Sequence, residues 1–108
     1  MRNDLWNRNQ LILTLNLYWK IPYHKISGSS NEEIKRLSPV IGKSPAAIAY
    51  MLMNFTALDD ERQDEKKIGK RPPGKLGTEI WFEYLNKWEQ LTDDSFKILE
   101  NKIGRAHV

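Results

Sequence analysis

Residues 41–55, IGKSPAAIAYMLMNF, carry the clearest structural signal in this sequence. Ser44 is a residue type that favours helix starts, because its hydroxyl accepts a hydrogen bond from an otherwise unpaired helical N–H. Pro45 follows at the first helical position, where its missing N–H costs nothing. The stretch therefore predicts a short helix with a defined start. Its apolar face consists of residues at one-face helical spacing, namely Ile48, Met51, Leu52 and Phe55.

A second helix is predicted immediately upstream. Residues 30–33 match the S-x-x-E pattern of a capping box, in which Ser30 would be the cap. Pro39 would remove a hydrogen bond inside this helix, so we expect the helix to end or kink near Ser38. Gly42 then provides a turn. Helix, glycine turn and capped helix are together typical of a helix-turn-helix, which we place at about residues 31–57.

A first helix is expected over residues 5–20, with Asp4 as its cap. Its apolar residues spread over an arc too wide for one buried stripe, because Leu13 and Leu17 extend the face that contains Leu15. We therefore expect this helix to pack on more than one side, or against a partner.

The second half of the chain is expected to hold two more helical segments. Residues 59–77 form a polar connector, because Pro72, Pro73 and Gly74 exclude continuous helix there. The C-terminal helices are placed over residues 78–102. Thr78 would cap the first of them, over residues 79–91, and a last segment would begin near residue 92 with Phe96 facing inward. The predicted fold class is all-α, a small domain of about five helices over residues 1–102.

Composition limits the class of protein. A length of 108 residues fits one domain, and a hydrophobic fraction of 40% with four Trp favours a globular chain. The absence of cysteine excludes a disulfide scaffold and a thiolate metal site. No apolar run approaches the roughly 20 residues that cross a bilayer, so we expect no membrane contact. The N-terminus has no apolar signal-peptide core, and we expect a cytoplasmic protein. The net charge of +3 is compatible with a nucleic-acid partner.

The last six residues, IGRAHV, are interpreted as an artefact of sequencing. Back-translated, they match the start of a common library adapter up to its stop codon. We therefore expect residues 103–108 to be adapter read-through, and the native coding sequence to break off near Lys102. The chain would then be an N-terminal fragment of a longer protein.

Catalytic chemistry is not indicated by the residue pattern. Outside residues 103–108 the single histidine is His24, in a segment that reads as a surface loop. One histidine without cysteine does not make a zinc site of the usual kind. The glycines near the basic residues match neither a P-loop nor a dinucleotide fingerprint. We predict no catalytic residue, no metal ligand and no cofactor in this chain.

Binding is better supported by the pattern on the third predicted helix. Asn54 can bond an adenine edge, and the small Ala47 allows a close approach to a major groove. The helix N-terminus and the lysine before it suit a phosphate. The predicted DNA-contacting face consists of Lys43, Ser44, Ala47, Tyr50 and Asn54. The same residues equally suit the solvated face of a small helix.

A basic run follows an acidic cluster in the connector. As a loop along the DNA backbone, it would add salt-dependent affinity. As an alternative, it is a soluble linker that balances the acidic residues before it. The basic residues are Lys66, Lys67, Lys70, Arg71 and Lys75.

Three stretches of this sequence resemble the N-terminal region of bacterial HNH-type endonucleases of the restriction or defence kind. They are Asn16–Leu17–Tyr18 with Ile21–Pro22, residues 42–55, and Glu79–Ile80–Trp81. The resemblance covers about residues 6–91. It implies a helical, double-stranded-DNA-binding region followed by a nuclease domain that uses a divalent metal and is missing here. The family usually has a basic residue at Met51, a glycine at His24 and a helix-compatible residue at Pro39, so Met51 is expected not to be fully buried.

Two other functions remain open at this point. One is a standalone helix-turn-helix transcriptional regulator, forming a homodimer through the broad apolar face of the first helix. The other is a protein-interaction module that positions a nuclease without touching DNA. A nuclease domain encoded after Lys102 would distinguish the endonuclease from the standalone regulator.

Overall fold

The computed structural model describes residues 5–22, 25–26, 30–59 and 71–103, and within them every regular element is a helix. The five helices are α1 (Arg8–Tyr18), α2 (Glu32–Ile41), α3 (Pro45–Thr56), α4 (Lys75–Tyr84) and α5 (Trp88–Ile103). The predicted all-α class with five helices is confirmed. Asp4 and His24 lie outside the described residues.

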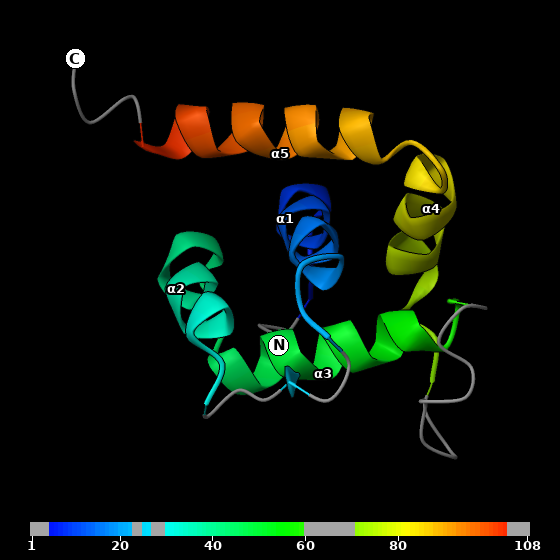
Figure 1. Ribbon diagram of the computed structural model, residues 1–108, viewed down its shortest axis with the longest axis horizontal. Helices are drawn as coiled ribbons and strands as arrows, with labels where there is room; N and C mark the ends of the chain where they lie inside the picture. Colours follow the sequence, from blue (N-terminus) through cyan, green and yellow to red (C-terminus); the bar gives the residue numbers. More distant parts are fainter. Residues whose placement is uncertain (1–4, 23–24, 27–29, 60–70, 104–108) are drawn as a thin grey trace.

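Helix α1 occupies the centre of the domain, and the other four helices surround it (Figure 1). Five consecutive residues, 11–15, are buried, which is more than one full helical turn. A helix buried over a whole turn has no free face, so the prediction that this helix packs on more than one side is confirmed.

The start of α1 differs from the prediction. Asn7 is the cap, and its side chain accepts a hydrogen bond from the Gln10 N–H at 2.9 Å. The Gln10 side chain accepts in return from the Asn7 N–H at 2.8 Å, which completes a capping box. Two unpaired donors are thus satisfied, and the helix begins three residues later than expected.

Helix α2 runs through Pro39 to Ile41, so the predicted end near Ser38 is wrong. Pro39 is exposed and lies close to the C-terminal end, where only one hydrogen bond is lost. The Gly42 N–H donates to the Ser38 carbonyl at 2.9 Å and closes the helix. At the other end the cap is Asn31 rather than Ser30, and its side chain accepts from the Ile34 N–H at 3.1 Å.

The C-terminal half is divided differently from the prediction. Helix α4 begins directly after Pro73 and Gly74, so Thr78 lies inside it and donates its hydroxyl proton to the Pro73 carbonyl at 2.8 Å. The break between the last two helices comes at Leu85–Lys87, and Asn86 there adopts a φ of 63°. Asparagine tolerates this left-handed conformation better than most residues, which explains why the chain turns here and not near residue 92. Phe96, predicted to face inward, is 62% exposed.

A single aromatic cluster joins the helices around the end of α1. Tyr18 contacts Phe55 of α3 and Trp81 of α4 in edge-on geometry, with ring centroids 6.0 and 5.6 Å away. Trp19 packs against Trp81 and against Trp88 of α5. The C-terminal end of α1 is therefore the point at which α3, α4 and α5 meet in the core.

Candidate nucleic-acid interface

A three-residue turn connects α2 to α3. Gly42 has a φ of 73°, a left-handed conformation that glycine adopts without penalty. Ser38 donates its hydroxyl proton to the Lys43 carbonyl at 2.6 Å, which holds the turn against α2. The Ser44 side chain accepts from the Ala47 N–H at 3.1 Å, and Pro45 occupies the first turn of α3. The predicted start of α3 is therefore confirmed in detail.

The residues predicted to contact DNA do not all share one surface. Tyr50 is 60% exposed, Ser44 is exposed and Ala47 is half-buried, so these three lie on the open side of α3. The Ser44 hydroxyl is already used as the helix cap. No charged residue occurs within α3 itself.

Asn54 is a correction to the predicted face. Its side chain is only 7% exposed, and its Oδ1 has no hydrogen-bond partner within the described residues. Ile48, Leu52 and Phe55 define the buried side of α3. Asn54 directly precedes Phe55, and each helical residue advances by about 100°, so Asn54 lies at the edge of the buried side. It therefore does not present an amide to a nucleobase in this structure.

Lys43 is tied to the segment that precedes α1. Its Nζ donates to the Leu5 carbonyl at 2.9 Å and lies 5.2 Å from the centroid of the Trp6 ring, in cation–π geometry. Sequence periodicity could not reveal this contact, because it joins residues 38 positions apart. The lysine thus anchors the N-terminal segment to the start of α3.

The described part of the basic run lies near the same surface. Arg71 and Lys75 are both exposed. Arg71 lies shortly before α4, and Lys75 is the first residue of α4. A groove of about 240 Å³ is lined by Leu5 and Trp6 on one side and by Met51 and the residues 74–77 on others. Lys75 lines this groove, and Lys43 contacts Leu5 and Trp6, which line it as well. Lys66, Lys67 and Lys70 lie outside the described residues.

Met51 lines this groove but is only 8% exposed. The expectation that Met51 is not fully buried is therefore confirmed, because part of its side chain still lines the groove.

A network of polar contacts ties α1 to α4 and α4 to α5. Arg8 donates two hydrogen bonds to the Glu83 carboxylate, at 2.8 and 2.5 Å, which raises the pKa of Arg8 and lowers that of Glu83. Tyr84 donates its hydroxyl proton to Asp94 at 2.5 Å. Burial, together with this hydrogen bond, raises the pKa of Tyr84 to about 12, and the same bond lowers the pKa of Asp94. Burial and contacts between neighbouring helices account for these pKa shifts, which indicates that the four residues have a structural role.

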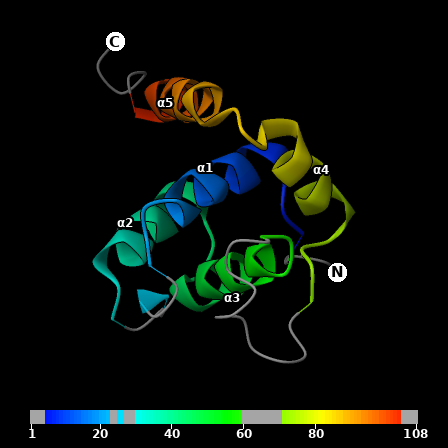
Figure 2. The same ribbon diagram turned by 45° about the vertical axis from the view of Figure 1, so that its right-hand side comes forward.

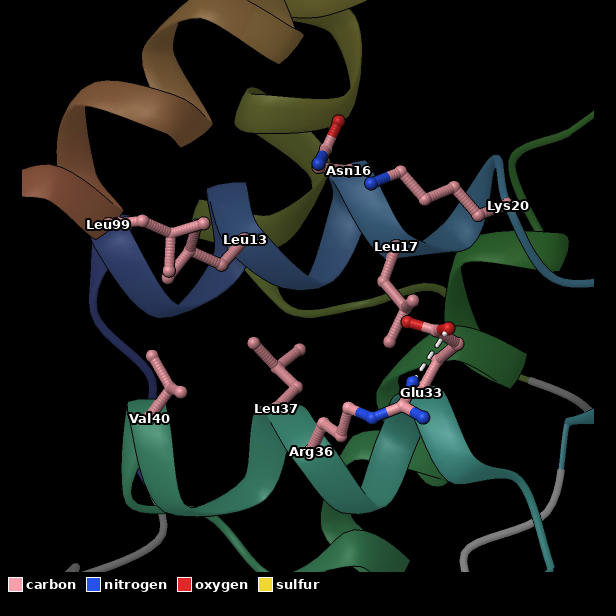
Figure 3. Close-up of a pocket in the computed structure, with 9 residues that line it drawn as sticks. All are labelled: Leu13, Asn16, Leu17, Lys20, Glu33, Arg36, Leu37, Val40 and Leu99. Carbon is pink, nitrogen blue, oxygen red and sulfur yellow. Dashed lines mark hydrogen bonds and ion pairs between the residues drawn. The ribbon is translucent and has the colours of Figure 1, made fainter. Parts of the chain in front are cut away.

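A shallow groove between α1, α2 and α5 has an apolar floor and a charged rim (Figure 3). Its volume is about 200 Å³, and Leu13, Leu17 and Leu37 point into it. On the rim, Arg36 is paired with Glu33 at 3.0 Å. These residue types offer neither a nucleophile nor an acid–base pair placed against one another.

Metal ligands do not gather in the part of the chain that the structure describes, where no three His, Cys, Asp or Glu residues come together. Over the same residues, no helix combines the length and the apolar character that crossing a bilayer requires. Comparison with known proteins gives no match to a family model, to a curated protein or to a solved structure.

Proposed function

We propose that this chain is a duplex-DNA-binding module in which α2 and α3 form a helix-turn-helix, and that it is the N-terminal module of an HNH-type endonuclease. One observation carries the proposal: a tight glycine turn leads into a capped helix α3 whose open side presents Tyr50, and Lys43 before that helix contacts the same residues, Leu5 and Trp6, that line the groove beside Lys75. The nuclease part of the proposal rests on the sequence resemblance. The divalent metal belongs to the proposed nuclease domain, for which this chain supplies no residues.

The geometry favours binding to the DNA backbone over reading of base edges. Asn54 is buried and α3 has no charge, so the remaining candidates for groove contact are Ala47 and Tyr50. Phosphate contacts position a protein on DNA without reading its sequence. Lys43, Arg71 and Lys75 suit that role. We therefore expect weak sequence preference and an affinity that falls as salt is raised.

The test is fluorescence anisotropy of labelled duplexes with the full chain at about 50 and 200 mM salt. Neutralising Arg71 and Lys75 together, as Arg71→Gln and Lys75→Gln, should reduce the slope of log affinity against log salt by about 2. Lys97→Gln removes one charge from exposed α5, on the far side of α1 from α3 (Figure 1), and serves as the control. No measurable binding at the lower salt concentration, or equal effects of the control and the double variant, would rule out this interface.

A specific observation favours a second function. The uncovered part of α3 is uncharged and includes Ala46, Tyr50 and the half-buried Met53, which is a composition that suits a protein partner. In that case α3 would position a nuclease without contacting DNA. Three results together would support this second function. The chain would bind a protein partner with an affinity that does not change with salt, Tyr50→Ala would abolish that binding, and the chain would not bind duplex DNA.

A further inference from the structure

The groove between α1, α2 and α5 has an exposed phenylalanine beside it. Leu99 of α5 contributes to the apolar floor of the groove (Figure 3). Phe96, three residues earlier on the same helix, is 62% exposed. This groove shares no lining residue with the groove beside Lys75. A role for the phenylalanine and the groove together is therefore independent of the proposed DNA binding.

The position of Phe96 relative to the groove follows from the helical repeat. Successive residues of an α-helix advance by about 100°, so Ser95 lies about 40° to one side of Leu99 and Phe96 about 60° to the other. Ser95 is 1% exposed and Leu99 is half-buried, so Leu99 lies at the edge of the buried side of α5. Phe96 is therefore exposed directly beside the edge of α5 that lines the groove.

The groove has room for a phenyl ring. Its volume is about 200 Å³, and Leu13, Leu17 and Leu37 point into it. An apolar cavity of about 150 Å³ is large enough to take up benzene. Phe96 does not fill the groove of its own chain, because most of its side chain is exposed. The chain thus carries an apolar ring and an apolar groove of matching size, both open to solvent.

The charges around Phe96 and around the groove are opposite in sign. The acidic residues within about 60° of Phe96 around α5 are all exposed, namely Glu89, Asp93 and Glu100. Among the residues that line the groove, two are basic, Lys20 and Arg36, and one is acidic, Glu33. The pair of Arg36 with Glu33 at 3.0 Å leaves the groove with a net positive charge. An acidic patch around a phenyl ring is complementary to such a groove.

We propose that two copies of this chain form a two-fold dimer in which Phe96 of each protomer inserts into the groove of the other. In a two-fold interface both subunits use the same patch, so the patch must carry both members of every contact. Phe96 and the groove meet this condition because they are adjacent on one side of α5. In the dimer, the acidic residues around each Phe96 come close to the partner's Lys20 and the partner's Arg36.

The primary experiment is sedimentation equilibrium of the full chain over a series of protein concentrations, without DNA. A monomer–dimer equilibrium is expected. Phe96→Ala should raise the dissociation constant by about 100-fold, because each dimer loses two buried rings. Phe82→Ala is the matched control, since it removes a similarly exposed phenylalanine, at 57%, from α4 outside the groove, and it should leave the constant unchanged.

Three outcomes would overturn the proposal. One is a chain that stays monomeric up to about 1 mM. Another is a dimer that Tyr50→Ala disrupts and Phe96→Ala does not, because the open side of α3 would then be the interface. The third is association that continues beyond the dimer, because a two-fold contact closes on itself.

A charge exchange tests the arrangement of the two patches. One double variant, Asp93→Lys with Glu100→Lys, makes the patch around Phe96 basic, and the other, Lys20→Glu with Arg36→Glu, makes the groove acidic. Each variant alone should dimerise at least about tenfold more weakly than the wild type, because like charges then face one another. The two mixed together should form a heterodimer about as tightly as the wild type, since both contacts again join opposite charges. A mixture that associates no better than the separate variants would contradict the pairing of Phe96 with the groove.

Discussion

Helices α1 and α3 differ in how many sides are covered, and the difference separates the centre of the core from a helix with one open side. Leu11 and Leu15 of α1 are at most 1% exposed, and four helices surround them (Figure 2). In α3, Ile48 is fully buried whereas Tyr50, two residues later, is 60% exposed. The clearest local sequence signal belongs to α3, but the centre of the core is α1.

The largest expected effect tests this comparison directly. Leu15→Ala should lower the free energy of unfolding by roughly 2–5 kcal/mol, because it leaves a cavity in the centre of the core. Tyr50→Ala on the open side of α3 should change it by less than about 0.5 kcal/mol. Urea unfolding followed by circular dichroism measures both. Similar losses of unfolding free energy in the two variants would contradict the distinction between a covered α1 and a partly open α3.

A smaller effect is expected at alkaline pH, on the side of α1 that α4 and α5 cover. The pKa of Tyr84 is raised from its ordinary value of 10.0 to about 12, so its neutral form is favoured in the folded state. The resulting stability is fully present below pH 10 and is lost as pH rises toward 12, on the order of 1–2 kcal/mol. Unfolding free energies at pH 8 and pH 11 for the wild type and Tyr84→Phe test this. The variant should lose less stability between the two pH values, and an equal loss in both proteins would contradict the assignment.

The smallest effect concerns the start of α3. Ser44→Ala removes the acceptor for the Ala47 N–H and should cost about 1 kcal/mol of stability. Ser44→Asp, which keeps an acceptor at this position, should restore most of the loss. If the cap matters only for α3, the alanine variant should also speed amide hydrogen exchange in the first turn of α3 while leaving α1 protected. Equally faster hydrogen exchange in α1 and α3 would show that the two helices open together.

Local patterns predicted the elements whose causes are local. Ser44 and Pro45 lie at the start of α3 as expected, because a cap depends on residues within one turn. The wide apolar arc of α1 predicted packing on several sides for a similar reason. The predictions for Pro39 and Thr78 were wrong: Pro39 lies inside α2 and Thr78 lies inside α4. The effect of each residue depends on its position along the helix and on its exposure, which the sequence alone does not report.

The candidate site was less predictable, because its contacts are distant in sequence. Helical spacing placed Asn54 with Tyr50, yet small rotations around the axis decide which residue at the edge of a face becomes buried. The contact of Lys43 with Leu5, and that of Tyr18 with Asp59, join separate parts of the chain.

The central position of α1 has a consequence for the order of events during synthesis. Helix α5 lies across α1, but about 70 residues separate the two in the chain. At roughly 5–20 residues per second, the ribosome exposes the leucines of α1 for several seconds before α5 can cover them. Nascent chains that lack α5 should therefore bind chaperones, and release should follow once residues 88–103 have left the exit tunnel.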